Sequence, residues 1–327
     1  MTKARILVTG GSGFIGAALV KGLVREGHTV RVLDDNSRGA PRRLAEIGDI
    51  VEFVAGDVRD PAAVEVAVRG VDEVHHLAFI NGTEFFYSAP DLVLEVGVKG
   101  IVNVIDACRR HGVGRLILAS SAEVYQSPQE VPTGEDVPLV VPDPMNPRYS
   151  YGAAKIISEI MAINFGRRYF ERVLIFRPHN VYGPDMGWEH VVPQFALRMK
   201  RAAAEHPSGT VPFAIQGSGN ETRAFCHVED LVRGILLMRE RGEHLGIYHI
   251  GTTDEVTIAE LARRVAAEFG RAIELQPGAA PRGGTLRRCP NIAKLAALGY
   301  APRISLSQGL AETVAWYDKN AHLAPSR

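Results

Sequence analysis

Short β-branched runs alternate with helical patterns through the first half of the chain, and this alternation constrains the fold more than any other feature. The strand candidates are Arg5–Thr9, Thr29–Asp34, Val51–Ala55, Glu73–Leu77, Arg115–Ala119 and Arg172–Phe176. The helix candidates between them are Phe14–Arg25, Ala62–Val68, Leu92–Arg110 and Tyr151–Tyr169. Such alternation predicts an α/β fold, a doubly wound parallel sheet with helices on both faces. The strands are almost wholly apolar, as expected where both faces of a sheet are covered.

The pattern changes after Pro178, where proline and glycine become frequent and the elements become short. We therefore expect a first domain of residues 1–177 and a smaller, mixed α/β lobe of residues 178–327. In this second half the sequence predicts helices at Asp230–Arg239 and Thr257–Phe269 and a strand at Ile247–Ile250. Because that strand can rejoin the main sheet, a segment near residues 225–250 is expected to interleave the two lobes.

Composition excludes several classes of function. The 37 Lys and Arg residues balance the 37 Asp and Glu residues, so the net charge gives no reason to expect binding to nucleic acid or to a charged membrane surface. No apolar run is long enough to span a membrane, and the first residues do not have the pattern of an export signal. The three cysteines, Cys108, Cys226 and Cys289, fit neither a metal site nor a disulfide framework. We expect a cytoplasmic protein without a metal centre.

A cluster of glycines, Gly10, Gly11, Gly13 and Gly16, separates the first predicted strand from the first predicted helix. Glycine destabilises regular elements, so such a cluster needs a structural reason. Three of these glycines are spaced as Gly-x-x-Gly-x-x-Gly. This spacing permits a tight turn, a close approach of the backbone to a phosphate, and close helix–strand packing. The cluster therefore predicts a dinucleotide whose pyrophosphate lies at the N-terminus of a helix.

Acidic residues follow the second and third predicted strands. Asp34 is placed to accept hydrogen bonds from the adenine ribose, and its charge would repel a 2′-phosphate, which favours NAD over NADP. The nearby Arg38 weakens that preference slightly. Asp57 has two interpretations: it can contact the adenine amino group, or it can cap the next helix.

Tyr151 and Lys155 are spaced by four residues and therefore share one face of a predicted helix. Tyr149 has no such lysine, because position 153 is alanine. A free phenol has a pKa of ~10 and is protonated at neutral pH. A neighbouring ammonium group and a positive nicotinamide ring would favour the phenolate and make Tyr151 a usable base.

Two serines, Ser120 and Ser121, stand where the predicted strand Arg115–Ala119 ends. Ligands of parallel sheets bind at the carboxyl ends of the strands. Ser121 is therefore placed to share a hydrogen bond with the substrate oxygen that Tyr151 deprotonates. The alternative role for this serine is to cap a turn.

With these residues in view, the chain resembles the extended short-chain dehydrogenase/reductase family. Within it, the chain is most similar to the nucleotide-sugar epimerase/dehydratase group, which includes enzymes of the UDP-glucose 4-epimerase type. The resemblance covers nearly the whole chain. It is carried by the glycine cluster, HHLAF (75–79), SSAEVY (120–125), Tyr151-x-x-x-Lys155, RPHNVYGP (177–184) and RAFCHVEDL (223–231). It implies a Rossmann-type domain that holds NAD, a C-terminal lobe that binds a nucleoside-diphosphate sugar, and a homodimer formed through the helices at Leu92–Arg110 and Tyr151–Tyr169.

The resemblance also implies roles for individual residues. At the cofactor it places Gly10, Gly13, Phe14, Ile15, Gly16, Asp34, Asn36, Ser37, Asp57, Val58, Leu77, Ala78, Tyr151 and Lys155. Ser121 and Tyr151 are expected to act at the sugar C4 hydroxyl, with Glu123 as a further catalytic candidate. At the substrate it places Glu84, Asn180, Arg223 and Arg282. The motif around Arg282 is degraded, so Arg287 or Arg288 is an alternative.

Some positions depart from the family pattern. Gly97 stands where relatives usually carry asparagine, and Phe79 replaces a common alanine. The segments Glu84–Tyr87 and MGWEHVVPQF (186–195) are unusual. We interpret them as signs of a specialised sugar pocket, with packing between the lobes as the alternative for Trp188 and Phe195.

The family shares a first step, in which a hydride passes from sugar C4 to NAD while Tyr151 takes the hydroxyl proton. A 4,6-dehydratase needs an acid–glutamate pair directly after the serine, but here Ala122 cannot donate a proton. Epimerisation needs only Ser121, Tyr151, Lys155 and NAD, so we predict an epimerase that forms a 4-keto sugar and returns the hydride to the opposite face. The alternatives are a dehydratase or decarboxylase that uses Glu123, an NAD(P)-dependent 4-keto-sugar reductase, and a non-catalytic dinucleotide sensor. A sensor would not need the serine, tyrosine and lysine together.

Overall fold

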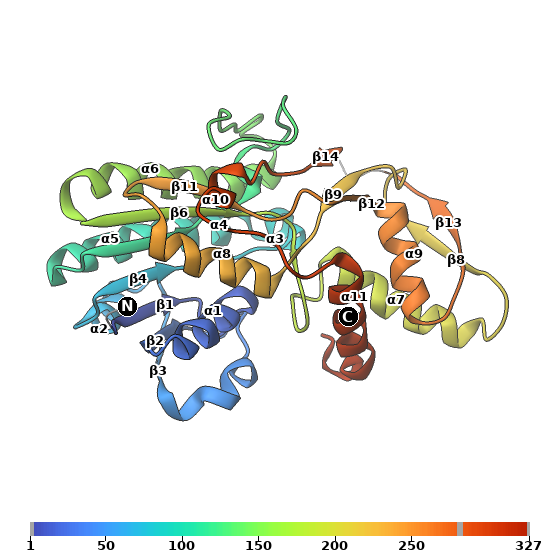
Figure 1. The fold of residues 1–327 in the computed structure, drawn as a ribbon, viewed down its shortest axis with the longest axis horizontal. Coiled ribbons are helices and arrows are strands. Elements are labelled where there is room, and N and C mark those ends of the chain that lie inside the picture. Colours follow the sequence, from blue (N-terminus) through green and yellow to red (C-terminus); the bar gives the residue numbers. More distant parts are fainter. Residues whose placement is uncertain (1–2, 280–283, 326–327) are drawn as a thin grey trace.

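The computed structural model describes residues 3–279 and 284–325 (Figure 1). The strands are β1 Arg5–Thr9, β2 Thr29–Asp34, β3 Val51–Ala55, β4 Glu73–His76, β5 Arg115–Ala119, β6 Arg172–Pro178, β7 Val181–Tyr182, β8 Val211–Ile215, β9 Thr222–Ala224, β10 Cys226–His227, β11 Gly246–Ile250, β12 Glu255–Thr257, β13 Ile273–Pro277 and β14 Arg287–Arg288. The α-helices are α1 Phe14–Arg25, α2 Pro61–Val68, α3 Thr83–Ser88, α4 Pro90–Leu94, α5 Gly100–His111, α6 Ser150–Tyr169, α7 Val191–Glu205, α8 Val228–Arg241, α9 Ile258–Glu268, α10 Ala293–Ala296 and α11 Leu306–Lys319. The helical segments of other types are the 3₁₀-helices η1 Pro41–Ile50, η3 Ala122–Val124, η4 Pro147–Tyr149 and η5 Ala321–Leu323 and the π-helix η2 Glu95–Lys99.

Within the described residues, seven strands form one parallel sheet in the order β11-β6-β5-β4-β1-β2-β3. The order β3-β2-β1-β4-β5-β6 is that of a Rossmann fold, in which the chain direction across the sheet reverses between β1 and β4. The predicted α/β fold is therefore confirmed. The predicted strand near residue 247 is β11, which pairs with β6 in the same sheet.

Both faces of the sheet are covered by helices, as Figure 1 shows. On one face, α1 and α8 bury the side chains of Ile6, Val8 and Val32 among others. On the other face, α2, α5 and α6 bury Leu7, Leu33 and their neighbours. Successive strand residues thus point into two separate apolar cores, which is why most of the strands have no polar side in the sequence. In β4, by contrast, the polar Glu73, His75 and His76 are buried.

A third apolar core lies beyond the end of the sheet, among α7, α9 and α11. Strands β8 and β13 pair there in a small parallel sheet, at the right of Figure 1. Trp188 packs against Trp316 and Tyr317 in this core, and Phe195 packs against Phe213. These contacts favour the packing interpretation of Trp188 and Phe195.

The helix expected at Leu92–Arg110 is present as one continuous helical stretch, but a π-helical turn interrupts its α-helical pattern. Helix α4 ends at Leu94, a π-helical turn spans Glu95–Lys99, and α5 begins at Gly100. The other predicted helices agree with the structure to within a few residues.

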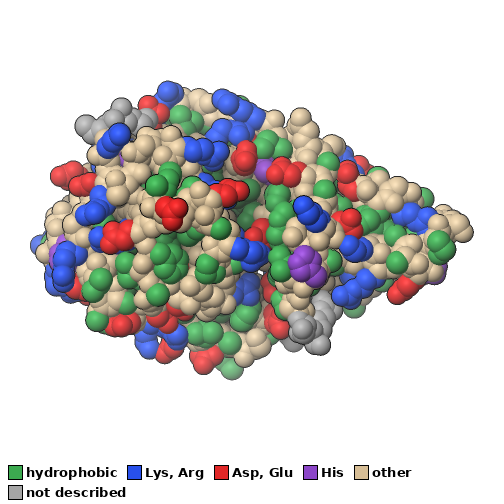
Figure 2. All heavy atoms as spheres, turned by 90° about the horizontal axis from the view of Figure 1, so that it is seen from below, with side chains coloured by type: hydrophobic (Ala, Val, Ile, Leu, Met, Phe, Trp, Pro, Cys, Tyr) green, Lys and Arg blue, Asp and Glu red, His purple; other side chains and the backbone are tan. Residues whose placement is uncertain are grey.

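The surface carries mixed charge, and Figure 2 shows basic and acidic side chains interspersed over the face that it presents. Among the helices of the described residues, none combines the length and the apolar character needed to cross a bilayer.

Candidate active site

A cavity of about 410 Å³ lies where the carboxyl ends of β1, β4 and β5 meet, beside the point at which the strand order reverses. Ligands of open α/β sheets bind in this crevice. The predicted site residues on its wall are Gly10, Gly13, Phe14, Ile15, Gly16, Asp34, Ser37, Asp57, Val58, Leu77, Ala78, Ser121, Glu123, Tyr151, Lys155 and Asn180. Residues far apart in the sequence thus reach one cavity, since they follow adjacent strands.

The glycine turn provides space for a phosphate group. Gly10 has a φ of +71°, and a Cβ added there would lie 2.8 Å from the Ala78 Cα atom. A Cβ at Gly16 would overlap the Gly10 carbonyl oxygen. Helix α1 begins at Phe14 without a side-chain cap, so its first N–H groups remain available to an anion in the cavity. The turn therefore fits the pyrophosphate of a dinucleotide.

The Asp34 carboxylate is fixed by two backbone N–H groups, from Ser12 and Asn36, each at 2.9 Å. It lies on the cavity wall, where a negative charge suits the ribose hydroxyls of NAD. The Asn36 side chain is not on that wall; it accepts a hydrogen bond from the Ser12 hydroxyl at 2.8 Å. Asn36 therefore supports the turn that carries Asp34.

Asp57 does not cap the helix that follows it, so that interpretation is wrong. Asp60 is the N-cap residue of α2, and its carboxylate accepts the N–H of Ala62 at 2.9 Å. Asp57 instead accepts hydrogen bonds from the backbone and guanidinium groups of Arg59. Because Asp57 and Val58 both lie on the cavity wall, they remain available to the adenine end of a cofactor.

Tyr151, Lys155 and Ser121 line the cavity together. Tyr151 and Lys155 are buried on the first turns of α6, and the Lys155 Nζ atom donates to the Ala119 carbonyl at 2.6 Å. The Ser121 hydroxyl oxygen accepts the N–H of Glu123 at 3.1 Å, so this serine does cap the turn η3. Ser121 also makes a hydrogen bond to Tyr151, so capping the turn and acting beside Tyr151 are compatible roles.

Burial controls the ionisation of this group. It lowers the pKa of Lys155 to about 7, although the charge of Glu159 opposes the shift. Burial also raises the pKa of Tyr151, and a hydrogen bond to Ser121 only partly offsets this. In the protein without its cofactor, burial therefore favours the neutral phenol of Tyr151. The phenolate was expected from the ammonium group and the nicotinamide ring together. The positive nicotinamide ring would have to supply the remaining stabilisation of the phenolate.

Two aromatic residues beside Tyr151 were not predicted as site residues. The Phe79 ring meets the Tyr151 ring edge-on at 5.0 Å, and the Phe86 ring stacks on it at 5.0 Å with an interplanar angle of 24°. Both phenylalanines lie on the cavity wall. The only sequence signal was their departure from the family pattern.

A cluster of arginines surrounds Glu123. Arg288 donates to the Glu123 carboxylate at 2.7 Å and lies on the cavity wall. Burial raises the pKa of Glu123, but the charges of Arg288, Arg148 and Arg223 outweigh it and hold that pKa below its usual range. Burial and the charge of Arg288 lower the pKa of Arg223 to about 10. Glu123 is thus an ionised carboxylate within an excess of positive charge.

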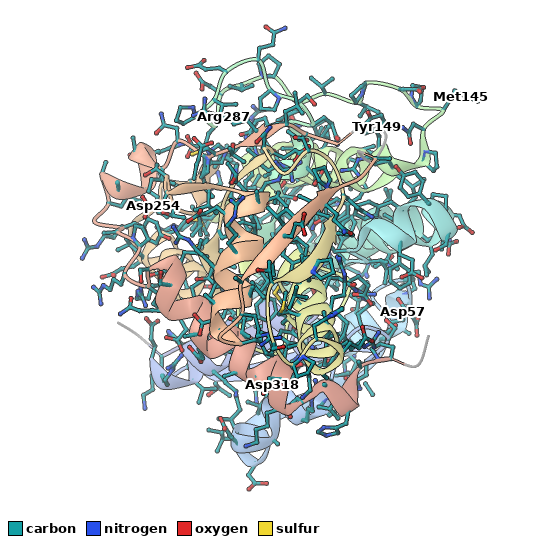
Figure 3. All side chains as sticks on the ribbon, turned by 90° about the vertical axis from the view of Figure 1, so that its right-hand side faces the viewer. Asp57, Met145, Tyr149, Asp254, Arg287 and Asp318 are labelled. Carbon is teal, nitrogen blue, oxygen red and sulfur yellow. The ribbon has the colours of Figure 1, made fainter. Side chains whose placement is uncertain are left out.

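The predicted substrate residues have different positions. Asn180 lies on the cavity wall, whereas Glu84 is exposed on α3. Arg223 is not among the residues of the wall and donates to the carbonyl groups of Thr285 and Leu286. Arg282 lies outside the described residues. Of its two alternatives, Arg288 reaches the cavity. Arg287 is half-exposed, pairs with Glu255, and lies at the upper edge of the molecule in Figure 3.

Arg43 lies on the cavity wall, although no sequence motif indicated it. It connects the glycine turn after β1 to the loop after β7. Its guanidinium group donates to the Ser12 carbonyl at 3.2 Å and pairs with Asp185 at 3.1 Å. Arg38 makes a similar link, from the Asn81 carbonyl to Glu189. These contacts join loops remote in sequence, so a motif could not reveal them.

Comparisons with known proteins agree with this geometry. The model of the NAD dependent epimerase/dehydratase family matches residues 6–251. The chain is 32% identical to UDP-glucuronic acid decarboxylase 1 of Arabidopsis thaliana, over 95% of this chain and 69% of that protein. The structure is similar to the dTDP-glucose 4,6-dehydratase DesIV of Streptomyces venezuelae, solved with NAD and TYD bound (TM-score 0.86, 32% identity, 98% of each chain). It is also similar to the UDP-glucose 4-epimerase of Thermus thermophilus in complex with NAD (TM-score 0.82, 29% identity, 96% of this chain and 98% of that chain). The protein therefore belongs to the NAD-dependent epimerase/dehydratase family, and its cofactor is NAD.

Proposed function

We propose that the protein is a nucleotide-sugar epimerase that oxidises the sugar at C4 and reduces the resulting 4-keto sugar from the opposite face. One observation carries the proposal. Ser121, Tyr151 and Lys155 share the cavity, while the position after Ser121 holds the buried, apolar Ala122. The residues for oxidation are therefore together, and the acid that would expel a C6 hydroxyl is missing.

The proposed roles follow from the hydrogen bonds of each group. NAD held by the glycine turn and Asp34 would supply the hydride acceptor for oxidation at C4 and the hydride donor for the return step. Tyr151 takes the proton of the C4 hydroxyl, and the charge of Lys155 stabilises the phenolate that does so. Ser121 would donate its O–H to the same substrate oxygen, while its own oxygen caps the turn by accepting the N–H of Glu123. Donation of the proton back by Tyr151 completes the reduction.

Dehydration at C6 needs a proton donor beside the leaving hydroxyl, and neither of the two residues that follow Ser121 provides one. Ala122 has no titratable group. Glu123 is held as a carboxylate by the surrounding arginines, and a carboxylate cannot donate a proton. This argument favours epimerisation over dehydration.

A second candidate is decarboxylation of a nucleotide uronic acid. It is favoured by the Arg288–Glu123 pair on the cavity wall, because Arg288 could bind a sugar carboxylate while Glu123 holds Arg288 in place. Cleavage of the C5–C6 bond of a 4-keto uronic acid releases carbon dioxide and leaves an enolate, which takes a proton from water at C5 before the hydride returns to C4, so no acid at position 122 is needed to expel a hydroxyl. The family relative from Arabidopsis thaliana has this activity in its name.

The products distinguish these reactions. The purified protein, without added NAD, is incubated with UDP-, dTDP-, GDP- and CDP-linked hexoses and hexuronic acids, and the products are analysed by mass spectrometry and NMR. We expect a product isomeric with its substrate and inverted at C4. A product that has lost water or carbon dioxide would replace the proposal with dehydration or decarboxylation. A strict need for added NAD(P)H would indicate a reductase.

We also propose that the protein is a homodimer formed through the outer faces of α5 and α6. Ile157 and Ile160 lie one turn apart on α6 and are 39% and 52% exposed, and Leu94 beside α6 is 39% exposed. A second copy of the chain would cover this apolar face. We expect Ile160→Arg to convert the dimer to a monomer in light scattering after gel filtration. Ile50→Arg, at an exposed isoleucine beside β3, should leave the mass unchanged; a monomeric wild type would contradict the proposal.

Finally, we propose residues 1–177 as the cofactor-binding domain and residues 178–327 as the substrate lobe. The cavity supports this division, because its wall takes the glycine turn from the first part and Asn180 and Arg288 from the second.

A further inference from the structure

The ring of Phe79 covers the ammonium group of Lys155. The Nζ atom lies 3.8 Å from the ring centre, and the ring edge meets Tyr151. Phe79 follows β4 by three residues and is part-buried, while Lys155 is only 3% exposed, so the ring is one of the groups that cover the ammonium group. One aromatic side chain thus contacts both members of the Tyr151–Lys155 pair.

Gly97 provides the space for this ring. A Cβ added at Gly97 would overlap the Phe79 Cζ atom and lie 2.8 Å from Cε2 and 3.0 Å from the Ala154 Cβ. The φ of Gly97 is not in the left-handed region, so its backbone conformation alone does not require glycine. Gly97 lies within the π-helical turn Glu95–Lys99, which brings the backbone against the ring. The two departures from the family pattern therefore belong together: the ring at position 79 fills the space that the missing side chain at position 97 leaves.

The ring affects Lys155 in two opposite ways. It excludes water, which disfavours the charged form of a lysine, and its π face attracts a cation, which favours that form. The other titratable groups near Lys155 and Tyr151 are Glu159 on α6, His76 on β4 and Glu123 on η3. All three groups stay in place when Phe79 alone is replaced.

We propose that Phe79, admitted by Gly97, is a positioning residue that holds the Lys155 ammonium group dry and oriented beside Tyr151. The proposal rests on the first, oxidative step of the proposed function. It does not depend on which product follows that step. Any polar side chain at position 97 would have to displace the ring, and the lysine would then gain water.

The first test measures the pKa of Lys155 directly, without substrate or turnover. The chain has seven lysines, so the purified protein labelled with ¹³C at lysine Cε gives few signals, and Lys155→Met identifies the one that disappears. In Phe79→Ala, water reaches the ammonium group and the titration should move to higher pH. In Phe79→Leu, an apolar side chain remains but the π face is lost, and the titration should move to lower pH.

Unchanged titration in both variants, or shifts of the same sign, would overturn the proposal. A decarboxylase or reductase would give the same titrations as an epimerase. Failure here and failure of the proposed function are therefore separate results.

The second test examines the fit between positions 79 and 97. Gly97→Ala should lower the midpoint of thermal unfolding and slow the reduction of bound NAD by the active nucleotide sugar by roughly tenfold, because the added methyl overlaps the ring. Phe79→Ala combined with Gly97→Ala should have a higher midpoint than Gly97→Ala alone, since the smaller residue removes the overlap. Additive losses of stability in the double variant would contradict the coupling.

Discussion

Replacing Tyr151 by phenylalanine is expected to lower kcat by roughly 10²–10⁴-fold, the range typical of a lost acid–base group, while NAD stays bound. The substitution removes one oxygen and keeps the ring between Phe79 and Phe86, so the cavity should keep its shape. The measurement is steady-state turnover of the active nucleotide sugar together with the NAD content of the purified variant.

Tyr149→Phe is the matched control. Tyr149 is in the neighbouring turn η4, with alanine rather than lysine four residues later. We expect this variant to keep its turnover. Activity in Tyr151→Phe, with loss in Tyr149→Phe, would mean that the base has been assigned to the wrong phenol.

The second large effect is on stability. Arg177→Leu is expected to lower the free energy of unfolding by about 3–5 kcal/mol, because it leaves a buried carboxylate without its partner. Arg177 and Glu159 are each 2% exposed and form a two-point pair, with N–O distances of 2.8 and 2.6 Å. Arg177 also donates to the Tyr125 hydroxyl and the Glu135 carbonyl. Urea unfolding, followed by circular dichroism, measures the change.

Arg264→Leu makes the same substitution in an exposed pair. Arg264 and Glu260 are 37% and 44% exposed and lie one turn apart on α9 at 2.9 Å. Exposed pairs contribute about 0–1 kcal/mol, so this variant should unfold close to the wild type. Equal losses of unfolding free energy in the two variants would show that burial does not explain how much the Arg177–Glu159 pair stabilises the protein.

Much of the sheet was predictable because most of its strands are buried on both faces; β3, at the edge, was predictable from its β-branched and aromatic residues although it is not buried. β1, β2, β3 and β5 have the predicted bounds, and α1 begins at the predicted Phe14. The segment after Leu92 was not predictable in the same way. The π-helical turn at Glu95–Lys99 contains the same types of residue as an α-helix, so the 3.6-residue periodicity of apolar side chains does not reveal it.

The candidate site was predictable where a motif fixes local spacing. Tyr151, Lys155, Ser121 and Glu123 lie on the wall of one cavity, although their catalytic roles remain proposals. Contacts across the fold were not predictable from spacing. The overlap of Phe79 with position 97 and the link from Arg43 to Asp185 depend on how separate loops approach one another.

The sheet order also has a consequence for synthesis of the chain. The outermost strand, β11, is encoded after β8, β9 and β10, so the edge of β6 has no partner until about 250 residues have left the ribosome. An unpaired strand edge is prone to join other chains. A shortened gene that ends before Gly246 would leave that edge permanently open and is expected to yield aggregates in place of an isolated nucleotide-binding half.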